Sequence, residues 1–96
     1  MFRIPRVNVV ESDEGFSVEV MGRTRLRYTQ GDKTLLVDCE IQAYGSPIAI
    51  VIFKSSIQNW GPPYDKDLID NATRDIIIDN IRRAFAFEGH KIDVGY

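Results

Sequence analysis

Apolar and polar residues alternate along much of the first half of the chain, which is the pattern of strands with one buried face. The clearest case lies on the two sides of the dipeptide Gly31-Asp32. A two-residue turn there pairs Tyr28 with Leu35 and Leu26 with Val37, so the apolar residues of both strands fall on one face. The sequence therefore predicts a hairpin with a fixed register.

The same register sorts charged residues onto the opposite face of the hairpin. Arg25 falls opposite Asp38, and Arg23 falls opposite Glu40. Apolar and ionic pairs thus separate onto two faces without adjustment, which supports the register because a one-residue slip would exchange the faces.

Four further runs are typical of strands. Residues 7–10 and 16–21 are short β-branched runs on either side of a polar cluster, and they predict a first hairpin. Residues 48–53, which follow a break at residues 44–47, contain no polar side chain and predict an interior strand buried on both faces. Residues 91–94 complete the set as a last strand.

A long helical pattern precedes that last strand. Asp70 or Asp67 is a candidate N-cap, the helix runs to about Phe87, and Gly89 lies just past its end. One stripe of the helix carries Ile77, Ile78, Ile81, Ala84, Phe85 and Glu88. We expect an α+β fold, with an antiparallel sheet of about five to six strands and one long helix packed on one face, in a single domain over residues 1–96.

Composition points to an ordinary folded protein, with 44% apolar and 27% charged residues. The formal charge of -2 is too small for a general attraction to nucleic acid. The first residues contain no apolar run of the length of a signal peptide, and the one cysteine, Cys39, fits a reducing compartment. We therefore expect a cytoplasmic protein with no membrane contact.

Residues capable of catalysis are few. His90 follows the helix end, where a positive charge suits the helix dipole, and Cys39 falls on the apolar parity of its strand. The aspartates 65, 67 and 70 could surround a cation, but carboxylates before a helix are commonly caps. We expect no enzyme, no metal site and no cofactor; a deep pocket holding His90 beside carboxylates would revive the enzyme hypothesis.

The stretch from Lys54 to Asp70 joins the most apolar strand to the helix and holds the only tryptophan. Gly61, Pro62 and Pro63 separate Trp60 from Tyr64 and make a regular strand or helix unlikely there. Two readings remain open for Trp60, which either plugs the end of the sheet or anchors a partner. The predicted partner-binding residues are Trp60, Tyr64, Asp65 and Asp67, with the exposed rim at Tyr64, Asp65 and Asp67.

Four segments carry a resemblance to a known family: GFSVEVMGRTRLRY, TLLVD, FKSSIQNWGPPYD and DNIRRAFAFEG. With them the chain resembles a small immunity-protein family of bacterial polymorphic toxin systems. The resemblance implies a non-catalytic protein that binds and neutralises a cognate toxin in the cytoplasm. It supplies no map of the toxin contact.

A second hypothesis uses the arginines of the sheet. Arg23, Arg25 and Arg27, with Arg3 and Arg6, would form a stripe that meets phosphates in a small nucleic-acid-binding accessory domain. The acids placed opposite two of these arginines would cancel much of their field. A protein partner is therefore preferred over nucleic acid.

Overall fold

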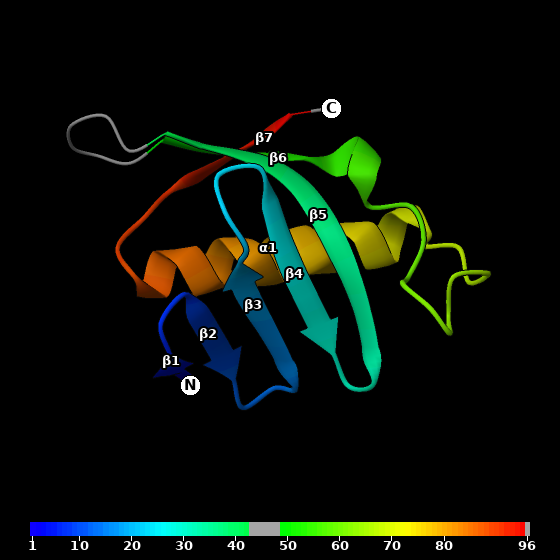
Figure 1. Ribbon diagram of the computed structural model, residues 1–96, viewed down its shortest axis with the longest axis horizontal. Helices are drawn as coiled ribbons and strands as arrows, with labels where there is room; N and C mark the ends of the chain where they lie inside the picture. Colours follow the sequence, from blue (N-terminus) through cyan, green and yellow to red (C-terminus); the bar gives the residue numbers. More distant parts are fainter. Residues whose placement is uncertain (43–48, 96) are drawn as a thin grey trace.

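One sheet and one helix make up the fold, as the computed structural model describes it over residues 1–42 and 49–95 (Figure 1). Within those residues the sheet has seven strands in the order of the chain, antiparallel except for the last pair, which is parallel. The elements are β1 (Phe2–Arg6), β2 (Val9–Ser12), β3 (Phe16–Val20), β4 (Arg25–Gln30), β5 (Lys33–Gln42), β6 (Ala49–Phe53), the short 3-10 helix η1 (Lys54–Ser56), α1 (Asn71–Phe87) and β7 (Ile92–Gly95). The predicted α+β class is confirmed.

Strand β1 is the strand that the sequence pattern missed. Its sequence, FRIPR, contains Pro5, which removes a backbone donor and argues against a strand. The strand nevertheless forms because it lies at the edge of the sheet, where it pairs with β2 alone and Pro5 can be tolerated. The predicted sheet of five to six strands thus gains one strand at its N-terminal edge.

The hairpin of β4 and β5 has the predicted register over the full length of β4. The observed pairs are Gln30 with Lys33, Tyr28 with Leu35, Leu26 with Val37, and Arg25 with Asp38. The predicted pairing of Arg23 with Glu40 is wrong, because β4 begins only at Arg25. On the N-terminal side of β4 the Ile41 amide donates a hydrogen bond to Arg23 O at 2.8 Å. In the regular register the acceptor would be the carbonyl oxygen of Gly22.

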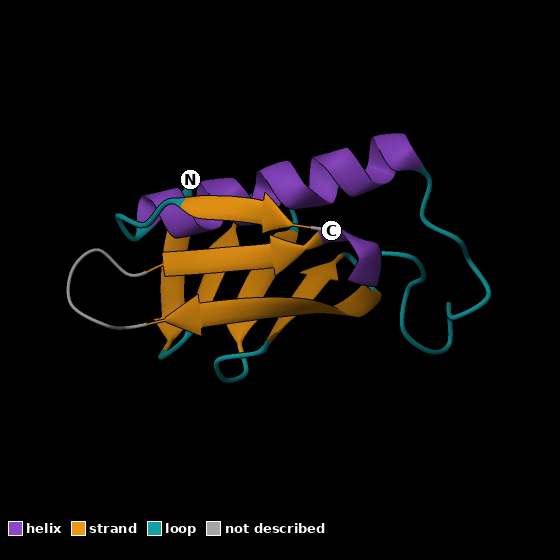
Figure 2. Cartoon of the chain, turned by 90° about the horizontal axis from the view of Figure 1, so that it is seen from above, coloured by secondary structure: helices purple, strands orange, loops and turns teal. Residues whose placement is uncertain are grey.

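Strand β5 is ten residues long and joins the two halves of the sheet. Its residues 33–38 pair with β4, and its residues 39–42 pair with β6. The sheet turns along this strand, and α1 lies along one side of it (Figure 2). Strand β6 is interior, as predicted, between β5 and β7.

The prediction that β6 is buried on both faces is wrong. Ile50 and Ile52 face the core, whereas Val51 and Phe53 are only half-buried. The reason is that α1 covers one side of the sheet (Figure 2), so the outward residues of β6 keep partial contact with solvent. The predicted break at residues 44–47 and the first residue of the predicted strand, Ile48, lie outside the described residues.

Helix α1 begins and ends where its sequence signals place it. Asp70 is the N-cap, and its carboxylate accepts a hydrogen bond from the Thr73 amide at 2.7 Å; Asp67 is not the cap. After the helix Gly89 adopts a φ of 84°, a conformation that glycine reaches without strain. The buried stripe contains the five predicted apolar residues and Asn80, whereas Glu88 is exposed.

The core lies between α1 and the inner face of the sheet. Leu26, Tyr28, Val37, Ile52 and the helix residues Ile77 and Ile81 are completely buried there. No helix in the described part of the chain is long and apolar enough to cross a membrane.

Candidate partner-binding surface

The side chain of Trp60 anchors the loop before α1 to the core. This side chain is 7% exposed, and its ring centre lies 6.4 Å from that of Tyr28 at an interplanar angle of 30°. The Trp60 amide donates to Asp67 O at 3.4 Å, and this hydrogen bond closes the segment of the loop from residue 60 to residue 67. In this structure Trp60 therefore positions the rim of the loop from within.

Gly61 brings the loop backbone against β5. Its amide donates to Thr34 O at 2.6 Å, and a Cβ atom at this position would lie 2.8 Å from that oxygen. Real Cβ atoms do not approach a backbone oxygen so closely, so the docking of the loop depends on glycine.

The rim of the loop meets the β4–β5 turn. The Tyr64 hydroxyl donates to Asp32 Oδ2 at 2.5 Å. Lys33 Nζ lies 5.2 Å from the ring centre of Tyr64 and 5.6 Å from that of Trp60, and it is 3.7 Å from Asp67 Oδ2. A hydrogen bond, an ion pair and one cation–π contact thus join the predicted rim to the turn, and a second cation–π contact joins the turn to Trp60.

The Tyr64 hydrogen bond holds the pKa of Asp32 below its ordinary value of 3.8, and the same bond raises the pKa of Tyr64. Because the pKa of Asp32 is lowered in the fold, the bond stabilises the fold above pH 3.8. This contribution is lost as the pH falls through the lowered pKa.

Tyr64→Phe should raise the pKa of Asp32 toward its ordinary value, because the ring stays in place and only the donor is lost. The measurement is an NMR titration of the aspartate carboxyl carbons. Asp70 is the internal control, since its pKa is lowered mainly by the Thr73 amide and should not move. An unchanged titration of Asp32 would refute the role assigned to the Tyr64 hydroxyl.

Asp65 and Asp67 present their carboxylates to solvent from a fixed backbone. Asn59 Nδ2 donates to Asp65 O at 3.2 Å, and the Asp67 amide donates to Tyr64 O at 2.9 Å. Both aspartates are exposed. The structure therefore brings Tyr64 and Asp67 together with Asp32 and Lys33, and leaves Asp65 beside them facing water.

Asp32 and Lys33 are rim residues that sequence reasoning did not assign to the surface. Their turn was recognised from Gly31-Asp32, but nothing local in the chain indicates that the turn lies against a loop thirty-two residues away. The structure thus adds Asp32 and Lys33 to the three predicted residues, and the rim consists of Asp32, Lys33, Tyr64, Asp65 and Asp67.

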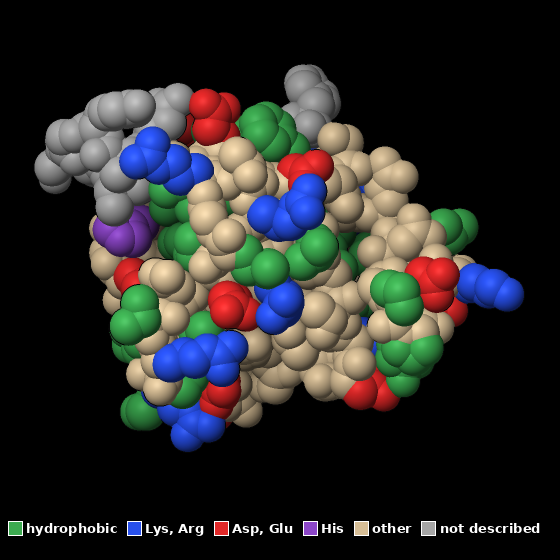
Figure 3. Space-filling model, viewed as in Figure 1, with side chains coloured by type: hydrophobic (Ala, Val, Ile, Leu, Met, Phe, Trp, Pro, Cys, Tyr) green, Lys and Arg blue, Asp and Glu red, His purple; other side chains and the backbone are tan. Residues whose placement is uncertain are grey.

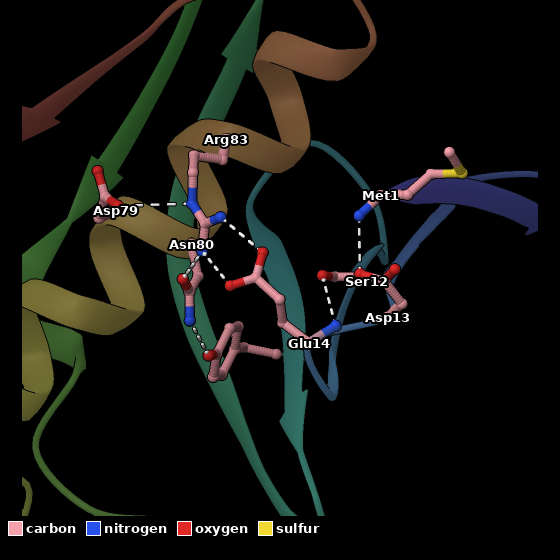
Figure 4. Close-up of polar contacts among 8 residues, drawn as sticks. Met1, Ser12, Asp13, Glu14, Asp79, Asn80 and Arg83 are labelled. Atoms are coloured by element: carbon pink, nitrogen blue, oxygen red, sulfur yellow. Dashed lines mark hydrogen bonds and ion pairs between the residues drawn. The ribbon is translucent and has the colours of Figure 1, made fainter.

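A second polar cluster joins α1 to the β2–β3 turn (Figure 4). Arg83 reaches from the helix to Glu14, with Nη1 2.8 Å from Oε2, and Nη2 of Arg83 donates to Asn80 Oδ1 at 2.5 Å. Asn80 Nδ2 in turn donates to the Tyr28 hydroxyl at 2.8 Å. Arg83 Nε is buried without a hydrogen-bond partner and lies 3.5 Å from Asp79 Oδ2.

This cluster borders an open groove of about 440 Å³ between α1 and the ends of the strands. The groove is lined by Glu14, Phe16, Gln30, Asp75, Ile76, Asp79, Asn80 and Arg83. The Arg83 hydrogen bond lowers the pKa of Glu14, so the carboxylate of Glu14 stays ionised at neutral pH. Nothing in the sequence pattern indicated that Glu14 lies beside Arg83 of the helix.

Four of the five arginines of the predicted stripe, Arg3, Arg6, Arg25 and Arg27, are paired with acids, and the two signs alternate across the outer sheet face (Figure 3). Arg27 and Arg6 lie 3.1 and 3.6 Å from the carboxylate of Glu19, and Arg25 lies 3.7 Å from Asp38. Arg3 is paired with Glu11. Such neutralised pairs offer a phosphate backbone little net charge, so the geometry does not favour nucleic acid.

His90 and Cys39 are not arranged for catalysis. His90 borders a depression of about 170 Å³ that holds one carboxylate, Glu88, among mostly apolar side chains. Burial raises the pKa of the Cys39 thiol to about 11, which disfavours a reactive thiolate. Across the described residues no group of three or more His, Cys, Asp or Glu side chains is placed to hold a metal ion.

Fold and surface together define a small α+β domain that presents a preformed polar rim beside an open groove. A family model described as Immunity protein 74 matches residues 17–95, and the chain belongs to this family of immunity proteins. The predicted family resemblance is thereby confirmed. No curated protein and no solved structure matches the chain.

Proposed function

We propose that this chain binds and neutralises a cognate bacterial toxin in the cytoplasm, without catalysis of its own, and that the rim makes the first contact. Membership of the immunity-protein family supports a toxin as the partner. The observation that carries the assignment of the surface is the convergence of the loop and the β4–β5 turn at Tyr64 and Asp32.

The fold already orders the rim, so binding a partner needs little further loss of conformational entropy there. Trp60 and Gly61 fix the loop on the core, so the rim loses little conformational freedom when a partner binds. Tyr64 supplies an aromatic ring, a residue type that contributes strongly at interfaces. Asp32, Asp65 and Asp67 outnumber the two lysines beside them, Lys33 and Lys66, so the rim suits a basic patch on the toxin.

The cytoplasmic location rests on cysteine usage. The chain has one cysteine, Cys39, which is buried and free. A fold that needs no disulfide suits a reducing compartment.

Exchanging Asp65 and Asp67 together for asparagine should weaken binding to the cognate toxin domain by roughly tenfold or more, since two charges at the partner's basic patch are lost. The double variant should fold normally, because Asp65 makes no side-chain contact in the described residues and the exposed Asp67 ion pair contributes little. Surface plasmon resonance over a salt series measures the effect.

The matched control is Asp93→Asn, which removes an exposed carboxylate from β7 and should leave the affinity unchanged. Equal affinities of the double variant, the control and the wild type would overturn the assignment of the rim.

A further inference from the structure

We propose that the groove beside Arg83 receives a short basic segment of the toxin, with a lysine or arginine side chain entering between Glu14, Asp75 and Asp79. This inference rests on the proposed function and names the partner chemistry of a second part of the same surface.

The floor of the groove is fixed before any partner arrives. Asn80 is only 7% exposed, and it donates to the Tyr28 hydroxyl at 2.8 Å while it accepts from Arg83. The Tyr28 hydroxyl donates in turn to Gln30 Oε1 at 2.6 Å. These bonds tie helix and sheet together under the groove, so a partner meets a preformed site.

The charge of the groove selects a cation. Three carboxylates line it, and two of them are already paired. Arg83 Nη1 lies 2.8 Å from Glu14, and Asp79 lies 3.5 Å from Arg83 Nε and 3.9 Å from Arg82 Nη1. Asp75 has no hydrogen bond or ion pair within the described residues. A phosphate would meet these carboxylates at close range, whereas an ammonium or guanidinium group would find Asp75 free to receive it.

The volume and the lining of the groove fit a segment with more than one side chain. About 440 Å³ lies within the range of sites that hold small ligands, and the groove is open to solvent along one side. Ile76 stands at the border with 57% of its surface exposed. An apolar residue next to the toxin's basic residue would bury this isoleucine, so the lining offers both an ionic and an apolar contact.

The groove lies close to the rim. Gln30 lines the groove, and Asp32, two residues further along the chain, holds Tyr64. The Gly31 amide donates to Gly15 O at 3.1 Å, which joins the β4–β5 turn to the β2–β3 turn that carries Glu14. These turns lie along the same edge of the sheet (Figure 1), so one partner can cover the rim and the groove together.

The test compares Asp75→Asn with Asp93→Asn in binding to the cognate toxin domain. Both variants remove one exposed carboxylate that makes no contact in the described residues, so both should fold. We expect Asp75→Asn to weaken binding about tenfold and to reduce the salt dependence of the association rate, and Asp93→Asn to do neither.

A second pair tests the apolar contact. Ile76→Ala should weaken binding about fivefold, while Ile4→Ala, which removes an isoleucine with 52% exposure from β1, should leave it unchanged. If the wild type binds but Asp75→Asn and Ile76→Ala match their controls, the groove assignment is overturned and the proposed function stands. If the wild type does not bind, the proposed function itself fails.

Discussion

Trp60→Ala is expected to lower the free energy of unfolding by about 3–5 kcal/mol. The indole is 7% exposed and packs against Tyr28, which is completely buried, so its removal leaves a cavity at the end of the core. Urea unfolding followed by far-UV circular dichroism measures the change, because the variant has no tryptophan to report by fluorescence.

Trp60→Phe is the companion variant, since it retains an aromatic ring and should cost clearly less than alanine. In the wild type the fluorescence of Trp60 should be shielded from a water-soluble quencher. A loss below about 1 kcal/mol for Trp60→Ala, or ready quenching, would contradict the position of Trp60 inside the core.

Gly61→Ala is expected to lower the free energy of unfolding by about 1–3 kcal/mol, because the new Cβ would lie 2.8 Å from Thr34 O and force the backbone of the loop off β5. The loop carries Tyr64, so the displacement should also break the Tyr64 hydrogen bond to Asp32. Chemical denaturation gives the stability, and the pKa of Asp32 reports the rim.

Lys66→Ala is the matched control in the same loop. Lys66 is exposed and makes no side-chain contact in the described residues, so the variant should stay within about 0.5 kcal/mol of the wild type. Equal stabilities of Gly61→Ala and Lys66→Ala would show that the close approach to Thr34 O does not hold the loop.

The hairpin and the helix could be predicted from the sequence because their signals are local. The register of β4 and β5 follows from a two-residue turn and the parity of a few apolar residues on each side. The start of α1 follows from one carboxylate, Asp70, that reaches the Thr73 amide. Each signal lies within a few residues of the element that it specifies.

The missed features depend on position in the sheet. Pro5 argues against a strand unless the strand is known to lie at an edge, and the partial exposure of Val51 and Phe53 follows from the face that α1 leaves open. The irregularity at Arg23 breaks a register that the charge pattern alone extends too far.

The rim was only half predictable for the same reason. Tyr64, Asp65 and Asp67 are marked by composition, since they lie beside two prolines and before a helix. Asp32 and Lys33 join them through contacts between the β4–β5 turn and the loop. Glu14 joins the groove from a turn sixty-nine residues before Arg83. Trp60 supports the rim from below, so a loss of binding in a Trp60 variant would mix stability with recognition.

Titration calorimetry of the wild-type chain with the purified cognate toxin domain tests whether this immunity protein works by binding a toxin. We expect a saturable complex of fixed stoichiometry with a dissociation constant on the order of nanomolar, as is common for stable protein complexes of standard interface size. The absence of binding heat and of complex formation at micromolar concentrations of both proteins would contradict it.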